Sequence, residues 1–350
     1  MNEGHSHRPE SLQQTGVDPL LVEVTRGNAV ESRHRAAIAV SDASGRILRQ
    51  WGDIERPVYA RSSLKPLQAL PLIETGAADR FGLGDAEIAL ACASHSGEER
   101  HVETVRVWLA KIGLTESDLE CGPQLPYHEA AALRRIVAGD EAVAIYNNCS
   151  GKHTGFLSTA MHKGEKTKGY IKLDHPVQQR ILGTLEQMTG LDLGHAPKGI
   201  DGCGIPVIGI PLRHTAMAMA RLADPAALPD HRAAAARRIV AAMIAEPFMV
   251  GGSGRFGTRL MTALGNRAAL KGGAEGFYIA ILPQQGLGIA IKCDDGAGRA
   301  AEVAMGMTLC HLGIITESEQ AELVDLLSPP VLNRAGLEVG RARRAAESPF

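Results

Sequence analysis

Residues 59–70, YARSSLKPLQAL, place two serines and a lysine where the sequence predicts that a helix begins. Pro66 has no backbone donor and therefore favours a first helical turn. Ser62 and Lys65 are three residues apart and would share a helix face, whereas Ser63 would point elsewhere. An amine near the positive end of a helix dipole binds its proton less tightly, so Lys65 could act as a base toward Ser62. The alternative is a capping serine followed by a solvated lysine.

A second hydroxyl and a second amine stand in other glycine-containing segments. Ser94 lies in CASHSGEE, between two predicted helices, and Lys271 lies in ALKGGAEG, directly before a predicted strand. Loops between regular elements often carry catalytic groups, so we pair these two side chains as a second site for proton transfer. Each also has a structural explanation, since Ser94 could be a turn hydroxyl and Lys271 a solvated charge.

Cysteines suggest a metal site. Cys149 and His153 are four residues apart in NNCSGKHTG, with Lys152 between them, and Cys203 lies in IDGCGIP. Two thiolates and one nitrogen could bind zinc, and spacing alone favours His153 as the nitrogen ligand. The alternatives are cysteines that act as small hydrophobic residues and a thiol protease dyad of Cys149 with His153.

The composition is that of an ordinary globular protein. The chain has 350 residues, 45% of them hydrophobic and 22% charged, with a formal net charge of −2. The absence of a basic excess argues against a nucleic-acid partner, and no apolar run is long enough for a membrane span. The polar first residues lack the pattern of a secretion signal, and the six scattered cysteines favour a reducing compartment. We therefore expect a cytoplasmic protein.

Strand-like segments lie at both ends of the chain and helical segments in the middle. The predicted strands are 20–27, 35–42, 45–52, 276–283 and 286–293, and the predicted helices are 62–75, 86–114 with a break near Ser94, 174–190, 230–246 and the segment after Gly298. This order predicts an α/β fold of the α+β type, with an antiparallel sheet built from both chain ends and a helical insertion. We expect residues 1–18 to be a tail, 19–335 a single catalytic domain and 336–350 a second tail.

The segments ARSSLKP, CASHSGEE, NNCSGKHTG, IDGCGIP and ALKGGAEGFYIAIL, in this order, resemble the rhizobial-type (class 3) asparaginases of the L-asparaginase II family. The fold of that family resembles the serine β-lactamases and penicillin-binding proteins. The likeness runs from about Leu20 to about Leu326. It implies that the pair Ser62 and Lys65 faces the pair Ser94 and Lys271. Lys271 with its two following glycines also resembles the lactamase Lys-Thr-Gly motif, with Gly in place of Thr.

The resemblance implies a zinc site formed by Cys149, Lys152 and Cys203, with the lysine as nitrogen ligand in place of His153. It also implies the substrate, the side-chain amide of L-asparagine, hydrolysed to L-aspartate and ammonia. Ser62 would attack the amide carbon, Lys65 would accept the proton of that hydroxyl, and an acyl-enzyme ester would form and be cleaved by water.

The remaining expectations concern substrate ends and partners. The pair Ser94 and Lys271 would deliver a proton to the departing ammonia. Asp201 suits the substrate ammonium and Arg61 its carboxylate, with His153 nearby. The resemblance and the frequency of symmetric dimers together predict a homodimer.

Three other functions fit parts of the same pattern. A β-lactamase-like serine hydrolase would be acylated by a penicillin. A zinc-dependent protein that only binds an amino acid would tolerate loss of Ser62 and Lys65. A zinc amidohydrolase that uses metal-bound water would depend on the metal more than on Ser62.

Overall fold

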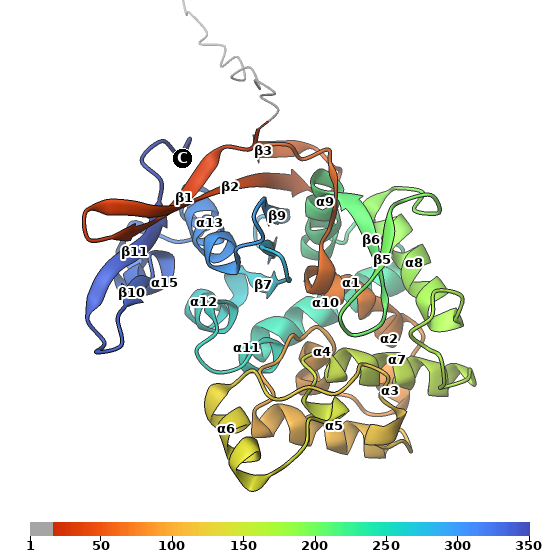
Figure 1. The fold of residues 1–350 in the computed structure, drawn as a ribbon. Coiled ribbons are helices and arrows are strands. Elements are labelled where there is room, and N and C mark those ends of the chain that lie inside the picture. The colour runs from red at the N-terminus through yellow and green to blue at the C-terminus, as the bar shows by residue number, and fades with distance from the viewer. Residues whose placement is uncertain (1–16) are drawn as a thin grey trace, which may run out of the picture.

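The structure, a computed structural model, describes residues 17–350. Nearly all of the expected tail over 1–18 therefore lies outside the described residues. An eight-stranded antiparallel sheet takes its strands from both ends of the chain, in the order β10-β11-β1-β2-β9-β8-β7 with β3 beside β2 (Figure 1). The predicted antiparallel sheet is thus confirmed. Its strands are β1 (Leu20–Arg26), β2 (Ala29–Asp42), β3 (Ile47–Trp51), β7 (Ala269–Gly272), β8 (Phe277–Leu282), β9 (Leu287–Cys293), β10 (Pro330–Leu332) and β11 (Glu338–Arg344).

The pairing of β2 with β9 joins the two chain ends at the centre of the sheet, from Ala36 opposite Cys293 to Asp42 opposite Leu287. Helix α9 (Leu212–Ala223) packs on β2, β8 and β9, and α13 (Gly298–His311) packs on β1, β8, β9 and β11. Every residue of β8 is buried, so helices and loops cover both faces of that strand. A continuous apolar run such as FYIAIL is typical of a strand with this burial.

Helices fill the part of the chain between β4 (Pro57–Tyr59) and β5 (Lys198–Ile200), which form a small second sheet with β6 (Pro206–Pro211). The predicted helices over 174–190 and 230–246 are present, each with Pro or Gly at its boundary, and the predicted break between helices occurs at Ser94. The helices are α1 (Lys65–Gln68), α2 (Leu70–Glu74), α3 (Ala77–Arg80), α4 (Asp85–Ala91), α5 (Glu99–Lys111), α6 (Glu129–Ala138), α7 (Ser150–Lys163), α8 (Pro176–Thr189), α10 (Asp230–Ala245), α11 (Pro247–Val250), α12 (Phe256–Leu264), α14 (Glu317–Glu322) and α15 (Val324–Leu327).

The expected tail at 336–350 is wrong for most of that segment. Residues 338–344 form β11, which pairs with β1 through Val22 opposite Arg344 and Val24 opposite Ala342. The charges that suggested a solvated tail have partners in the sheet, since Arg343 Nε donates a hydrogen bond to Glu23 Oε1 at 2.9 Å. A strand with ion pairs on its polar face and the small side chain of Ala342 on its buried face can pair between β10 and β1 without a long apolar run.

The buried apolar residues form one connected cluster that includes both the sheet and the helical part. Over residues 17–350, the structure contains no helix with the length and apolarity that crossing a bilayer requires.

Candidate active site

The segment that carries Ser62 is a short 3₁₀ helix, η1 (Arg61–Leu64), and Lys65 opens α1 behind it. Pro66 occupies the first turn of α1, as predicted. Neither serine caps a helix, because the residues at the cap positions are Ala60 and Leu64 and no side-chain cap bond is formed. The change from 3₁₀ to α geometry between Ser62 and Lys65 alters the relative direction of their side chains.

Both lysine amines reach the hydroxyl of Ser94. Lys271 Nζ lies 2.9 Å and Lys65 Nζ 3.1 Å from Ser94 Oγ. Each amine also donates to a nearby main-chain carbonyl, Lys65 to Ala93 and Lys271 to Gly272. The structure therefore brings Ser94 and Lys271 together as expected, and it gives Lys65 the partner Ser94 in place of the expected Ser62.

Burial makes the charged form of both amines unfavourable. Lys65 is fully buried and Lys271 nearly so. Burial lowers the pKa of Lys65, and burial together with the nearby charge of Lys65 holds the pKa of Lys271 well below its ordinary value. A neutral amine beside a hydroxyl is the state that a general base requires.

Ser62, Ser94 and Lys271 line one cavity of about 280 Å³, and Tyr127 and Asn148 also contribute to its wall. A volume of this size accommodates a small molecule such as an amino acid.

Gly273, two residues after Lys271, lets the end of β7 approach η1. A Cβ atom at Gly273 would lie 2.7 Å from the carbonyl oxygen of Ala60 and 2.8 Å from Ser63 Oγ, so a larger residue would push the two segments apart. Ser63 Oγ also donates a hydrogen bond to the Lys271 carbonyl at 3.1 Å. These contacts explain how a residue far along the chain reaches the cavity beside Ser62.

Cys149, Lys152 and Cys203 also converge. Lys152 Nζ lies 3.0 Å from Cys203 Sγ, and the Cys149 thiol contacts Cys203 and the Lys65 amine. Contact with Cys203, assisted by the charges of Lys152 and Lys65, holds the pKa of Cys149 well below its ordinary value. Burial lowers the pKa of Lys152, but the two sulfur atoms outweigh burial and raise it overall.

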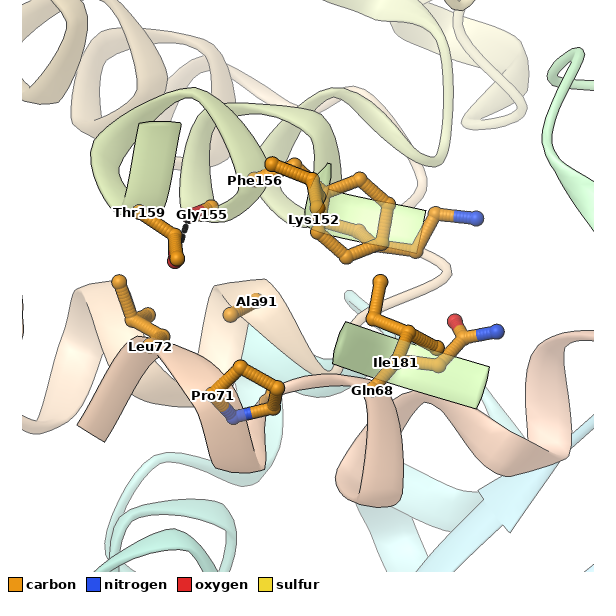
Figure 2. Close-up of a pocket in the computed structure, with 11 residues that line it drawn as sticks. Gln68, Pro71, Leu72, Ala91, Lys152, Gly155, Phe156, Thr159 and Ile181 are labelled. Atoms are coloured by element: carbon orange, nitrogen blue, oxygen red, sulfur yellow. Dashed lines mark hydrogen bonds between the residues drawn. The ribbon is translucent and has the colours of Figure 1, made fainter. Parts of the chain in front are cut away.

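Beside this cluster lies a small apolar cavity of about 10 Å³, which is no larger than one water molecule and cannot hold a substrate. Figure 2 shows the Lys152 side chain next to the ring of Phe156, with its amine pointing away from Leu72 and Thr159. The amine lies 5.8 Å from the centre of the Phe156 ring. The aliphatic part of Lys152 thus packs in the apolar layer while its nitrogen faces the sulfur atoms.

A metal site here would need a lysine ligand. Across residues 17–350, no three or more His, Cys, Asp and Glu side chains are grouped so that they could hold a metal ion. His153 is fully buried and its Nδ1 atom lies 2.7 Å from the hydroxyl of Tyr170. Two thiols and one amine, with Cys203 in contact with both Cys149 and Lys152, are the sulfur and nitrogen donors that zinc accepts, provided that the amine loses its proton. The donor set therefore fits zinc.

Arg61 and Asp201 bind each other. Nε and Nη2 of Arg61 donate to Asp201 Oδ1 at 3.0 and 2.7 Å, and the backbone N–H of Gly202 donates to the same oxygen. Burial would raise the pKa of Asp201, but the hydrogen bonds from Arg61 and the charge of Lys152 lower it overall. Neither Arg61, Asp201 nor His153 lines the cavity of Ser62.

Two charged residues on the wall of that cavity escaped the sequence reasoning. Arg255 directly precedes α12, and Glu302 lies on α13. The glycine-rich stretch GGSGR before a helix was a usable signal for Arg255, because such turns often border sites. A single glutamate in an apolar helix gave no comparable signal for Glu302.

The comparison with protein families agrees with the motif-based expectation. A family model described as L-asparaginase II matches residues 22–344. No curated protein matched the chain. A crystal structure of a β-lactamase from Mycobacterium bovis is 15% identical, with a TM-score of 0.41, and the match covers 79% of this chain and 94% of the other. A structure from Bacteroides dorei, described provisionally as a β-lactamase, is 15% identical with a TM-score of 0.37, over 74% and 84% of the two chains.

Proposed function

Because this chain belongs to the L-asparaginase II family, we propose that it hydrolyses the side-chain amide of L-asparagine to L-aspartate and ammonia. The family makes it a hydrolase of the asparaginase type, and the precise substrate is our proposal. The observation that carries it is the placement of two buried amines on the hydroxyl of Ser94, in a cavity that Ser62 also lines. Hydroxyls beside amines of lowered pKa are the groups that covalent amide hydrolysis needs.

The proposed reaction proceeds in two steps. Ser62 Oγ attacks the amide carbon, and this attack forms a tetrahedral intermediate. The proton of the Ser62 hydroxyl passes to the Lys65 amine. The C–N bond then breaks, the amide nitrogen leaves as ammonia with this proton, which Lys65 passes on through Ser94, and an acyl ester on Ser62 remains. Water attacks this ester, the neutral amine of Lys271 accepts the proton of that water through Ser94, and this proton returns through Ser94 to Ser62 Oγ as L-aspartate leaves.

Zinc is part of the proposal. Cys149, Lys152 and Cys203 would hold the ion, which supplies a fixed positive charge beside the site when bound. The residues of the chain carry the reaction, and Lys65, which contacts Cys149, links the zinc ligands to Ser94. Arg61, Asp201 and His153 stay proposed as binding residues, through the atoms that their own hydrogen bonds leave free, such as Asp201 Oδ2. A homodimer and a cytoplasmic location stay predictions.

One set of measurements tests the proposal against its rivals. We expect wild-type protein to release ammonia from L-asparagine, Ser62→Ala to lose this activity, and metal-stripped protein to retain part of it. Mass spectrometry of a quenched reaction should show an added aspartyl group on the peptide that contains Ser62. A mild effect of Ser62→Ala with complete loss on metal removal would instead indicate a metal-bound water as the nucleophile. Acylation by a penicillin without ammonia release would indicate a β-lactamase-like hydrolase.

A further inference from the structure

Arg255 and Glu302 face the cavity of Ser62 without partners of their own. Among residues 17–350, neither side chain forms an ion pair or a side-chain hydrogen bond, although both line the cavity. The nitrogens of Arg255 lie more than 4.0 Å from the carboxylate oxygens of Glu302, so the two residues do not neutralise each other by contact. A cation and an anion are thus both available to whatever occupies the cavity.

An unpaired charge in a partly buried position is unfavourable unless a ligand supplies the missing partner. Glu302 is only partly exposed, and burial raises the pKa of its carboxyl despite the charge of Arg255. A bound cation would offset this cost, and the exposed guanidinium of Arg255 is free to pair with an anion in the cavity. The cavity therefore favours a ligand with one group of each sign.

The reactive groups share this cavity. Ser62, Ser94 and Lys271 line it together with Arg255 and Glu302, and the charge of Arg255 is near enough to act on the amine of Lys271. The Arg61 and Asp201 pair, in contrast, is already joined by two hydrogen bonds and lies off the wall of the cavity. A small ligand whose amide meets Ser62 can therefore have its charged groups beside Arg255 and Glu302.

We propose that Arg255 binds the α-carboxylate and Glu302 the α-ammonium of a free amino-acid amide whose side-chain amide lies at Ser62. This inference rests on the proposed function and specifies its substrate class. The substrate has both α-groups unblocked. An asparagine within a peptide is excluded because it lacks both charges, and one with a blocked amino group is excluded because it lacks the ammonium. Asp201 and Arg61 then act at the amide end, next to the zinc ligands.

Binding measurements on Ser62→Ala protein, which cannot form the acyl ester, test this assignment. The probes are L-asparagine, N-acetyl-L-asparagine, which lacks the ammonium, and L-asparaginamide, which lacks the carboxylate. Isothermal titration calorimetry should show that each blocked probe binds about 10- to 100-fold more weakly than L-asparagine, as expected for loss of one charge-assisted hydrogen bond.

A second substitution, added to Ser62→Ala, identifies the residue that binds each charged group of the substrate. Adding Arg255→Gln should weaken the binding of L-asparagine by a similar factor and leave the affinity for L-asparaginamide unchanged. Arg255→Lys should restore part of the affinity for L-asparagine. Adding Glu302→Gln should remove the preference for L-asparagine over the N-acetyl probe. Arg259→Gln is the matched control, because Arg259 lies in α12 just after Arg255, is exposed as Arg255 is, and does not line the cavity. Equal weakening of all three probes by Arg255→Gln, or no weakening, would overturn the assignment.

The outcome is separable from that of the proposed reaction. Ammonia release by the wild type reports on hydrolysis, and calorimetry on Ser62→Ala protein reports on recognition without turnover. If the wild type releases no ammonia while the probes follow the expected pattern, the reaction is wrong and the binding assignment stands. If ammonia is released while the probes bind equally, the reverse holds.

Discussion

Replacing Lys271 with methionine should stabilise the folded protein and remove most of its activity. The amines of Lys271 and Lys65 are 2.9 and 3.1 Å from the same oxygen of Ser94, so their nitrogens lie within about 6 Å of each other. Two positive charges at that separation repel by about 3 kcal/mol at an effective dielectric constant of about 20. Releasing one proton avoids the repulsion but costs about 1.4 kcal/mol for each unit by which the pH lies below the ordinary lysine pKa of 10.5.

These two limits give the size of the effect. At pH 7 the charged form of Lys271 destabilises the fold by at least about 3 kcal/mol, because Lys65 repels it. The destabilisation is at most about 5 kcal/mol, because the amine can release its proton at that cost. Methionine has a similar length and packs without a charge. The variant loses the hydrogen bonds of Lys271 to Ser94 and Gly272, which together contribute about 1 to 3 kcal/mol. We therefore expect Lys271→Met to raise the free energy of unfolding by about 2 kcal/mol at pH 7.

Chemical denaturation at several pH values measures this effect. The pKa of Lys271 is lowered in the folded state, so the folded protein binds fewer protons than the unfolded chain between the lowered value and 10.5. Wild-type stability therefore rises with pH across that window, and the advantage of Lys271→Met should disappear as the pH passes 10.5. Ammonia release at pH 7 should fall by about 10²- to 10⁴-fold, as for loss of a general acid or base.

Lys292→Met is the matched control for the stability measurement. Lys292 lies on β9, two strands from β7 in the same sheet, is partly buried and also donates to main-chain carbonyls, but it has no hydrogen bond to Ser94 and does not line the cavity. We expect this variant to retain activity. A Lys271→Met protein that is less stable than wild type at pH 7, or a stability gain that does not change with pH, would refute the idea that two crowded amines share Ser94.

Three further predictions follow from other parts of the site. Ser63→Ala should cost about 1 kcal/mol of stability and leave activity within about threefold, because Ser63 bonds the Lys271 carbonyl and does not line the cavity; denaturation and ammonia release measure both. Asp201→Ala should raise KM strongly for L-asparagine and should weaken the binding of both blocked probes by a similar factor in calorimetry, and an unchanged KM would remove Asp201 from the binding site. Cys149→Ala should lower the zinc content measured by mass spectrometry and reduce activity, and a chelator should then have no further effect on that variant.

The sequence determined the elements whose boundaries depend on local chemistry. Alternating and continuous apolar runs specified β1, β8 and β9, because burial of a strand face requires them. Pro176 and Gly190 specified both ends of α8, since one favours a first turn and the other the left-handed conformation that ends a helix. The motif segments, in their order, also indicated the family.

Tertiary packing decided which reactive groups meet. The spacing of Ser62 and Lys65 predicted a shared helix face, but the two residues lie in different helix types, and the amine turns to Ser94. Ser94 lies between α4 and α5, and Lys271 reaches the same hydroxyl because β7 approaches η1; spacing along the chain encodes neither arrangement. The same reason explains Arg255 and Glu302: their charges became informative only when packing placed them, unpaired, beside Ser62. Local sequence sets backbone conformation through nearest-neighbour forces, whereas a catalytic site is a set of distances between segments that only the packed core fixes.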